Sequence, residues 1–210
     1  SVMSKVWNKK IFKNIQEKVD LASVSLAEER GACPDAAEYG MKERFSNKTA
    51  IAPTASISII CGGSSPGIEP IAANSYTHKT LSGSFNVRNK YLKKILQKHK
   101  KDTDDVWSTI TTNQGSVAHL DFLTPEEKDT FKTAFEIDQR WIVELGADRT
   151  PHISQAQSIN IFIPADIHKK DLHDLHFQAW KKGLKSLYYC RSKSIQRAEN
   201  VNKGTSTDVT

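Results

Sequence analysis

The chain has 210 residues, of which 38% are hydrophobic and 26% charged, a mixture typical of globular proteins and unlike disordered or fibrous chains. It carries 30 Lys and Arg against 24 Asp and Glu, so its formal net charge is +6. No apolar run approaches the roughly 18 residues of a membrane span, and the charged N-terminal stretch is unlike a secretory signal. Cys33, Cys61 and Cys190 are too scattered for a disulfide framework or a metal site, which favours a reducing, cytoplasmic location.

The positive excess is local and lies in two lysine clusters, within 90–101 and 169–185. Aromatic residues do not interleave with these lysines as a base-stacking platform requires. The lysines stand at helical spacing beside apolar residues, so solvated helix faces are favoured over a nucleic-acid groove. A basic nucleic-acid-binding domain stays the weaker alternative, and it predicts DNA affinity that falls steeply with salt.

The N-terminal part of the chain is predicted to begin with a helix over 9–30, capped at its C-terminal end by Gly31. Its apolar positions recur at steps of three and four and predict one buried face, made of Ile11, Ile15, Val19, Ala22 and Leu26. Residues 49–52 resemble a short buried strand that Pro53 ends. Residues 57–60 are predicted to open a short helix, and a glycine- and serine-rich loop follows.

The middle of the chain has β-favouring residues over 77–87, broken by Gly83, and then predicted helices over 89–100 and 102–112. A further helix is predicted to start with a capping box, in which Thr124 is the cap, Pro125 takes the first helical position and Glu127 closes the box. This helix is expected to run to about Gly146, with an apolar face made of Phe131, Phe135, Ile142 and Leu145.

The C-terminal part reads as a strand–helix–strand unit, with strands over 158–163 and 187–190 and a helix over 168–182. The helix is expected to stop at Gly183 and to turn four residues inward, namely Leu172, Leu175, Ala179 and Trp180. Alternating strands and helices indicate the α/β class, and a parallel pair of strands here requires a right-handed crossover. The polar residues from Ala198 onward are expected to form a mobile tail.

The first candidate site is the stretch from Pro53 to Ser58, where a strand end passes into a helix start. Such a turn directs backbone N–H groups and the positive end of the helix dipole one way, and the hydroxyls of Thr54 and Ser56 add donors. Ala55 leaves the approach open, so a phosphate could bind without a lysine. From the residues alone, an ordinary strand-to-helix turn with a hydroxyl cap remains the favoured alternative.

The second candidate is the tyrosine pair, Tyr188 and Tyr189. Adjacent residues on a strand point to opposite faces, so the residues alone favour two half-buried sheet aromatics over a redox pair. The three histidines of the C-terminal helix, His168, His173 and His176, favour a helix surface over a zinc site. No cysteine pairs convincingly with a histidine for nucleophilic catalysis, and the G-x-S-x-G elbow of hydrolases is absent.

Six segments, taken in chain order, resemble the large (α) subunit of class I ribonucleotide reductase. They are LAEERGACP (26–34), IAPTASIS (51–58), GIEP (67–70), NSYTHKTLSGSF (74–85), QSINIFI (157–163) and LHFQAWKKGLKSLYY (175–189). Each is modest alone, but the six in the family's order make the resemblance specific. It covers about residues 9–197 and concerns the C-terminal part of that subunit.

The resemblance implies the C-terminal portion of a ten-stranded α/β barrel, incomplete alone, over residues 1–197, with a flexible polar tail over 198–210. It also implies reduction of ribonucleoside diphosphates to deoxyribonucleoside diphosphates by radical chemistry, for DNA synthesis. The family's substrate diphosphate lies on a loop that matches Pro53, Thr54, Ala55, Ser56 and Ile57. The family's paired tyrosines match Tyr188 and Tyr189, and they relay an electron and a proton between the small subunit and the active-site cysteine.

The resemblance further implies four partners: the diphosphate substrate, the rest of the large subunit, a radical-generating small subunit and a second large subunit in a homodimer. It implies no cofactor on this chain, a radical from a metal-containing small subunit, an external dithiol of the thioredoxin or glutaredoxin type, and effector nucleotides bound elsewhere. The radical cysteine is expected upstream of Ser1, and the tail lacks the usual cysteine pair. We therefore expect no activity from the chain alone, and neither a membrane nor nucleic acid as a direct partner.

A second class of function stays open at this point. A half-barrel could serve as a non-enzymatic module that binds reductase subunits and regulates them, which predicts binding without turnover. An isolated half-barrel would also expose barrel-facing apolar surface and unpaired strand edges, so self-association of the isolated chain is expected.

Overall fold

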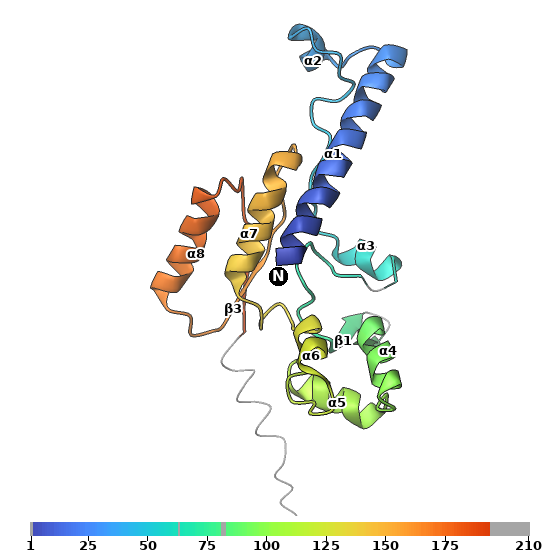
Figure 1. Ribbon diagram of the computed structural model, residues 1–210, viewed down its shortest axis with the longest axis vertical. Helices are drawn as coiled ribbons and strands as arrows, with labels where there is room; N and C mark the ends of the chain where they lie inside the picture. Colours follow the sequence, from blue (N-terminus) through green and yellow to red (C-terminus); the bar gives the residue numbers. More distant parts are fainter. Residues whose placement is uncertain (1, 63, 81–82, 194–210) are drawn as a thin grey trace, which may run out of the picture. The chain divides into compact units, whose positions relative to one another are not determined.

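The computed structural model describes residues 2–62, 64–80 and 83–193, which form two compact units (Figure 1). Unit 1 comprises Ser1–Pro53, Gln139–Ile161 and His168–Tyr189, and unit 2 comprises Thr54–Asp138, Phe162–Ile167 and Cys190–Thr210. The tail predicted over 198–210 lies outside the described residues. No helix in the described part of the chain is long and apolar enough to cross a membrane.

Unit 1 is built around three helices, in which α7 packs against both α1 and α8 (Figure 1). The helices of this unit are α1 (Val2–Arg30), α2 (Pro34–Glu38), α7 (Gln139–Arg149), the 3-10 turn η1 (Thr150–His152) and α8 (Lys169–Lys181). Their core is a small apolar cluster made of Val143, Ile161, Leu175 and Ala179, with Leu172, Leu184 and Leu187 against it. This cluster joins α7 and α8 to the end of the chain segment that enters β3.

Helix α1 confirms the helix predicted over 9–30, and Gly31 ends it with a φ of +82°, as a C-terminal cap requires. The predicted apolar face is wrong, because Ile11 and Ile15 are 49% and 38% exposed while Ser23 and Ala27 are buried. The buried face is set by a polar contact, since the Ser23 hydroxyl accepts the backbone N–H groups of Arg44 and Phe45. Apolar periodicity alone does not report such a contact.

The extended segments in the first and last parts of the chain form only short ladders. Ile51 forms an isolated parallel bridge with Gln157, through hydrogen bonds of 3.2 Å to the Ala156 carbonyl and 2.8 Å from the Ser158 amide. Strands β3 (Ile161–Ile163) and β4 (Cys190–Ser192) then form a two-stranded sheet. The strand–helix–strand unit predicted over 158–190 is therefore present, although β4 starts three residues later than predicted.

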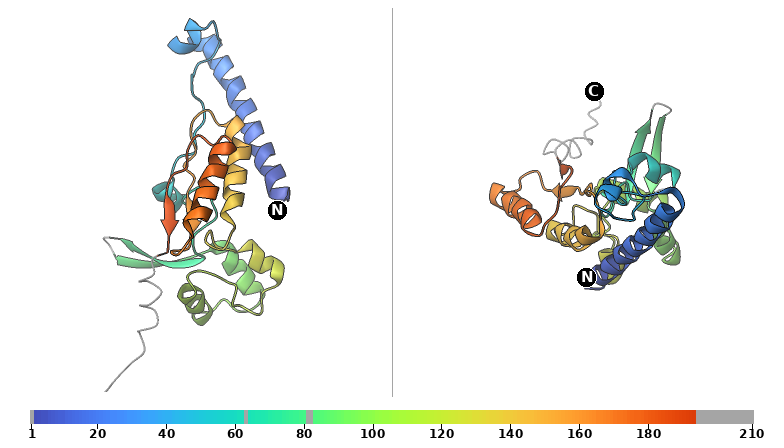
Figure 2. Two further views of the ribbon diagram at one scale, coloured as in Figure 1. Left: turned by 90° about the vertical axis from the view of Figure 1, so that its left-hand side faces the viewer. Right: turned by 90° about the horizontal axis from the view of Figure 1, so that it is seen from above.

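Unit 2 combines a hairpin with short helices around a second core. Its elements are α3 (Ala55–Ile60), β1 (Ser75–Thr80), β2 (Gly83–Arg88), α4 (Lys90–Lys98), α5 (Asp104–Thr112) and α6 (Pro125–Thr130). Strands β1 and β2 pair antiparallel in register from Ser75–Arg88 to Thr80–Gly83 (Figure 2). The core is a cluster of fully or nearly buried side chains, namely Leu92, Leu96, Trp107, Ile110, Val117, Leu120 and Leu123.

The helix starts of unit 2 follow local capping chemistry. Asn89 accepts hydrogen bonds from the first amides of α4, and Thr124 and Glu127 form the predicted capping box at α6. The predicted continuation to Gly146 is wrong, because α6 ends at Thr130 and α7 starts anew at Gln139. The carboxylate of Glu136 accepts both the amide and the hydroxyl of Thr133 at 2.8 Å, a local turn that competes with the helix.

Helix α8 confirms the helix predicted over 168–182, with His168 as its N-cap and Gly183 at a φ of +78° after its end. Leu175 and Ala179 are buried as predicted. Trp180 was predicted to turn inward, and this is wrong, because its side chain is 71% exposed. Its ring instead packs on the surface against Phe177, with 5.4 Å between ring centroids.

Candidate active site

The loop from Pro53 to Ile57 is exposed at the start of α3. Thr54 is the N-cap residue, but its side chain makes no capping hydrogen bond, and Ser56 and Ile57 lie exposed in the first turn. The segment is a turn into a helix, as the interpretation favoured from the residues alone has it, but without the hydroxyl cap that this interpretation assumed. The first-turn amides have no intrahelical acceptor, because an α-helix leaves its first N–H groups unpaired.

Two hydrogen bonds fix the backbone of this loop, and a third lies just after α3. The Thr54 amide donates to the Pro66 carbonyl at 3.0 Å, and the buried Ser58 hydroxyl donates to the Ala55 carbonyl at 2.7 Å. After α3, the ammonium of Lys90 donates to the Gly62 carbonyl at 3.1 Å. The hydroxyls of Thr54 and Ser56 and the adjacent amides are thus presented as donors, a set suited to an anionic oxygen.

Tyr188 and Tyr189 lie in ring contact, with 4.1 Å between their centroids and an interplanar angle of 53°. The prediction that they point to opposite faces is therefore wrong. Both residues precede the regular strand β4, which begins at Cys190, so the alternation of a strand does not apply to them. The two side chains are 46% and 53% exposed, so the pair is reachable from outside this chain.

The backbone around the tyrosines is bonded to the segment that leads into β3. The Tyr188 amide donates to the Ile159 carbonyl at 2.7 Å, and the Ile161 amide donates to the Tyr189 carbonyl at 2.9 Å. The Tyr189 amide donates to a side chain, the Oδ1 of Asn160, at 3.3 Å. Sequence reasoning did not single out Asn160, although an asparagine within an apolar strand-forming run is an unusual choice that could have drawn attention.

The histidines of α8 each have a structural role. His168 accepts the Lys170 amide at 3.2 Å, His176 donates to the Leu172 carbonyl at 2.8 Å, and the His173 ring stacks on Phe177. In residues 2–62, 64–80 and 83–193, no group of three or more His, Cys, Asp or Glu side chains is arranged to hold a metal ion. Cys33, Cys61 and Cys190 are free thiols.

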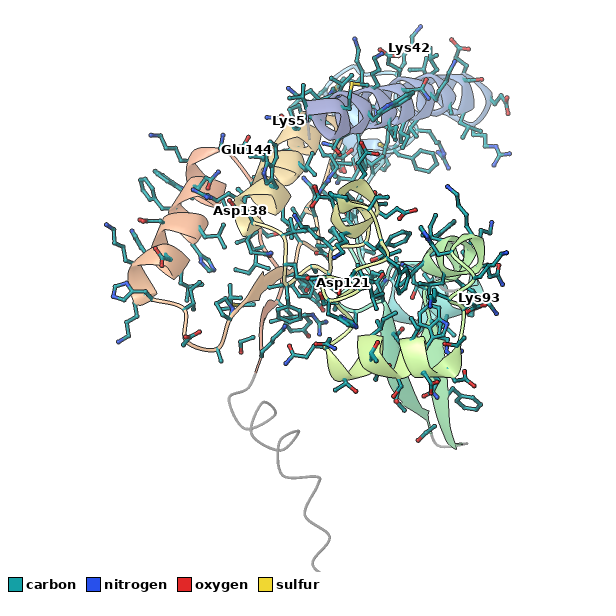
Figure 3. All side chains as sticks on the ribbon, turned by 60° about the horizontal axis from the view of Figure 1, so that its bottom comes forward. Lys5, Lys42, Lys93, Asp121, Asp138 and Glu144 are labelled. Carbon is teal, nitrogen blue, oxygen red and sulfur yellow. The ribbon has the colours of Figure 1, made fainter. Side chains whose placement is uncertain are left out.

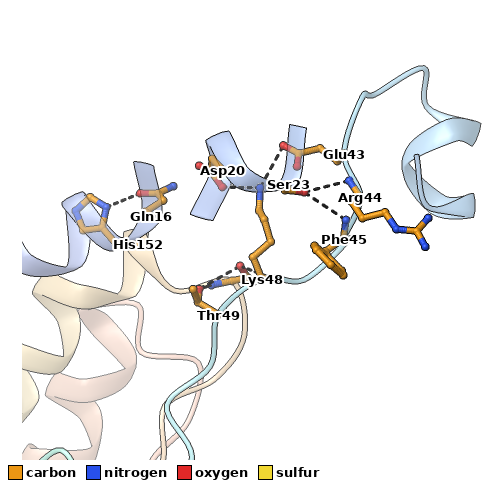
Figure 4. A network of polar contacts seen from close by, with 10 residues as sticks. Gln16, Asp20, Ser23, Glu43, Arg44, Phe45, Lys48, Thr49 and His152 are labelled. Carbon is orange, nitrogen blue, oxygen red and sulfur yellow. Dashed lines mark hydrogen bonds and ion pairs between the residues drawn. The ribbon is translucent and has the colours of Figure 1, made fainter. Parts of the chain in front are cut away.

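A small pocket of about 160 Å³ in unit 1 is lined mainly by polar side chains that are already paired (Figure 4). Gln16 bonds His152 at 2.6 Å, while Lys48 pairs with Asp20 at 2.5 Å and with Glu43 at 3.2 Å. Burial opposes the charge of Lys48, but the hydrogen bonds that its ammonium donates to Asp20 and Glu43 outweigh this effect and raise the pKa of Lys48. These pairs connect α1 to the segments that carry Lys48 and His152.

Comparison with known proteins gives matches to one family over most of the chain. Residues 35–190 match the family model described as ribonucleotide reductase, barrel domain. The ribonucleoside-diphosphate reductase large subunit of Invertebrate iridescent virus 6 is 47% identical over 196 residues, which is 91% of this chain and 20% of that protein. The same subunit of Caenorhabditis elegans is 36% identical over 147 residues, or 70% of this chain and 18% of that protein.

A solved structure gives the same result. The Actinobacillus ureae class Id ribonucleotide reductase alpha subunit is 38% identical and superposes with a TM-score of 0.84, over 98% of this chain and 36% of that one. The chain therefore spans about a third or less of the length of these relatives. Both candidate sites fall within the part that the comparisons cover.

Proposed function

Because the chain belongs to the ribonucleotide reductase family, as part of the large-subunit barrel domain, we propose that it helps to reduce ribonucleoside diphosphates to deoxyribonucleoside diphosphates. In this role it supplies two parts of an active site that the rest of the large subunit completes. Residues Pro53–Ile57 bind the substrate diphosphate, and Tyr188 and Tyr189 pass the radical. The reaction takes place in the cytoplasm, where unpaired cysteines such as those of this chain stay reduced.

The observation that carries the proposal is the ring contact of Tyr188 and Tyr189 at 4.1 Å. A tyrosyl radical moves when the phenol of one tyrosine gives an electron and a proton to the phenoxyl radical of its neighbour, which becomes a phenol while the donor becomes the radical. This exchange is favoured when the two rings are in contact. The exposure of both side chains leaves the pair accessible to a subunit that delivers the radical. In this scheme the metal-containing small subunit supplies the radical, and a cysteine elsewhere in the large subunit receives it.

The phosphate role of the loop rests on its match to the family's substrate loop and on its donors. Thr54 and Ser56 contribute hydroxyls, and the exposed first-turn amides contribute N–H groups. These groups stabilise negative charge without a permanent positive side chain.

The remaining components of the reaction lie outside this chain. Electrons come from an external dithiol of the thioredoxin or glutaredoxin type, and effector nucleotides bind outside this segment. Two large subunits form the homodimer.

The relay is tested by removing one phenol oxygen at a time in the large subunit that contains this chain, assayed with its small subunit. Tyr188→Phe and Tyr189→Phe keep the ring but cannot form a phenoxyl, so diphosphate reduction should fall by at least about 100-fold. Tyr39→Phe is the matched control, because Tyr39 is 78% exposed and outside the pair. Full activity with Phe at both 188 and 189 would show that the relay assignment is wrong.

The phosphate loop is tested separately by binding. Thr54→Val and Ser56→Ala should weaken diphosphate binding about tenfold or more, the usual effect of losing a hydrogen bond to a charged group. Thr112→Val is the control, since its hydroxyl bonds the Ser108 carbonyl on an exposed helix face. Unchanged affinity in both loop variants would remove the two hydroxyls from the site. Subunit binding with no turnover, even in the complete assembly, would instead favour a regulatory module.

A further inference from the structure

Tyr188 and Tyr189 together lie opposite a single residue, Asn160, in the segment that leads into β3. In a regular parallel ladder, one residue supplies both the N–H and the C=O that face the residue across from it. Opposite Asn160, Tyr188 supplies the N–H, to the Ile159 carbonyl, and Tyr189 supplies the C=O, to the Ile161 amide. This count of two against one is that of a β-bulge, and it lies directly before the paired strands β3 and β4 begin.

The bulge turns the Tyr189 amide toward the side chain of Asn160. Consecutive N–H groups of a regular strand point to opposite edges, whereas those of Tyr188 and Tyr189 both face the segment 159–161. The Tyr189 N–H is taken up by the Asn160 Oδ1 at 3.3 Å. The Asn160 carboxamide therefore supplies an acceptor that only the bulged arrangement brings into reach, and this favours the bulge over a regular strand.

The bulge also decides where the rings go. A regular strand would send adjacent side chains to opposite faces, and the extra residue cancels that alternation. The rings of Tyr188 and Tyr189 accordingly meet at 4.1 Å. From this geometry we infer that Asn160 is a positioning residue, whose carboxamide oxygen holds the Tyr189 amide in the bulge and thereby places the two tyrosine rings in contact.

The buried neighbours of Asn160 hold its backbone in place. Its neighbours Ile159 and Ile161 are 0% and 1% exposed, so packing on both sides holds the backbone at this point. Asparagine is a poor strand former, and a valine or threonine would suit the local structure better. A residue that violates local preference between two buried isoleucines is expected where a specific hydrogen bond is needed.

This inference rests on the proposed radical role of the tyrosines, and its test separates the two. Asn160→Leu and Asn160→Val both remove the acceptor, and valine as a strong strand former guards against misfolding. Asn160→Asp keeps an acceptor oxygen in place. Ser186→Ala is the matched control, because the Ser186 hydroxyl bonds the Gln157 carbonyl at 3.4 Å between the same two segments without involving the tyrosines.

Each variant is made in the complete large subunit, its crystal structure is solved, and diphosphate reduction is measured with the small subunit. In the Leu and Val variants we expect the rings to separate beyond about 7 Å, outside the range of aromatic contact. The reduction rate should fall on the order of 100-fold, as for other misplaced reacting groups. The Asp variant should keep the ring contact and most of the rate, and Ser186→Ala should match the unsubstituted enzyme.

Two results would contradict different parts of the argument. If the rings stay in contact in both the Leu and the Val variants, the Asn160 carboxamide does not position them, and the inference is wrong. If the rings separate while the reduction rate is unchanged, Asn160 does position the pair, but the proposed relay through Tyr188 and Tyr189 fails. Loss of activity with rescue by aspartate supports both.

Discussion

Lys5 and Glu144 form an ion pair of 3.2 Å between α1 and α7, although they are 139 positions apart in the chain (Figure 3). The same carboxylate pairs with Lys182, just after α8, at 2.7 Å and accepts a hydrogen bond from Gln178 at 3.2 Å. Glu144 thus connects all three long helices of unit 1. The side chain of Glu144 is 24% exposed, so water screens these contacts only in part.

Glu144→Gln should lower the free energy of unfolding by about 1 kcal/mol, because two ion pairs lose their negative partner. The measurement is urea unfolding of the chain followed by tryptophan fluorescence. Glu17→Gln is the control, since its pair with Lys13 is long, at 3.8 Å, and more than half exposed on both sides. The control should change stability by less than about 0.5 kcal/mol. Equal effects of the two substitutions would contradict the bridging role of Glu144.

The same carboxylate predicts an acid dependence. Its hydrogen bond with Lys182, then the contacts with Lys5, lower the pKa of Glu144 from the ordinary value of 4.5, against the opposing effect of burial. A lowered folded-state pKa gives stability that is fully present above pH 4.5 and lost as the pH falls through the folded value. The stability difference between the unsubstituted chain and Glu144→Gln should therefore be constant near neutral pH and shrink below that value. Unfolding curves taken across this range check it, and a difference that grows on acidification would contradict it.

The capping box of α6 gives a prediction on unit 2. The Thr124 hydroxyl accepts the Glu127 amide at 3.2 Å, while the Glu127 carboxylate accepts the Thr124 amide at 3.0 Å. Thr124→Ala should cost about 1 kcal/mol of stability, the usual effect of losing an N-cap, and Thr124→Ser should restore it. Thermal unfolding of the three proteins is the measurement. An alanine variant as stable as the unsubstituted chain would show that the box adds nothing to the fold.

Such caps could be predicted because their chemistry is local. Thr124, Pro125 and Glu127 lie within four consecutive positions, and the hydrogen bonds of the capping box run only between Thr124 and Glu127. The end of α6 could not be predicted, because it depends on Glu136 reaching back to Thr133 in place of a helical turn. Periodicity likewise predicted the apolar positions of α1 and α8 but not what covers each face, so Ile11 and Trp180 were misplaced.

The same distinction between local chemistry and contacts of distant segments applies to the candidate site. The stretch from Pro53 to Ser58 was recognised as a possible anion site from its own residues, because a helix start presents its amides, but only the resemblance to the family favoured that site over an ordinary capped turn. The contact of Tyr188 with Tyr189 was not predicted, since strand alternation predicts the reverse. It depends on Asn160, which lies 29 positions from Tyr189 in the chain. Local chemistry could be predicted from the residues, and pairing across the fold required the structure.

Gly115 combines a left-handed backbone conformation with a close approach to the backbone of Ala73 and Asn74. Its φ is +83°, and a Cβ built there would overlap with the Cβ of Ala73. The next residue, Asn74, is buried and donates through its side chain to the Gly115 carbonyl at 3.0 Å and to the Phe131 carbonyl at 2.7 Å. Asn89 in turn donates to the Asn74 side chain at 2.8 Å, so this contact also fixes the start of α4.

Gly115→Ala should therefore destabilise unit 2 by about 2–4 kcal/mol, the sum of the cost of a positive φ and that of overpacking. Gly62→Ala separates the two causes, since Gly62 has a similar φ of +79° but no atom within 4 Å of the added Cβ. That control should lose only about 1 kcal/mol. Urea unfolding of the two variants gives the comparison. Equal losses would mean that the segment carrying Ala73 moves aside freely, and that the hydrogen bonds of Asn74 do not hold it against Gly115.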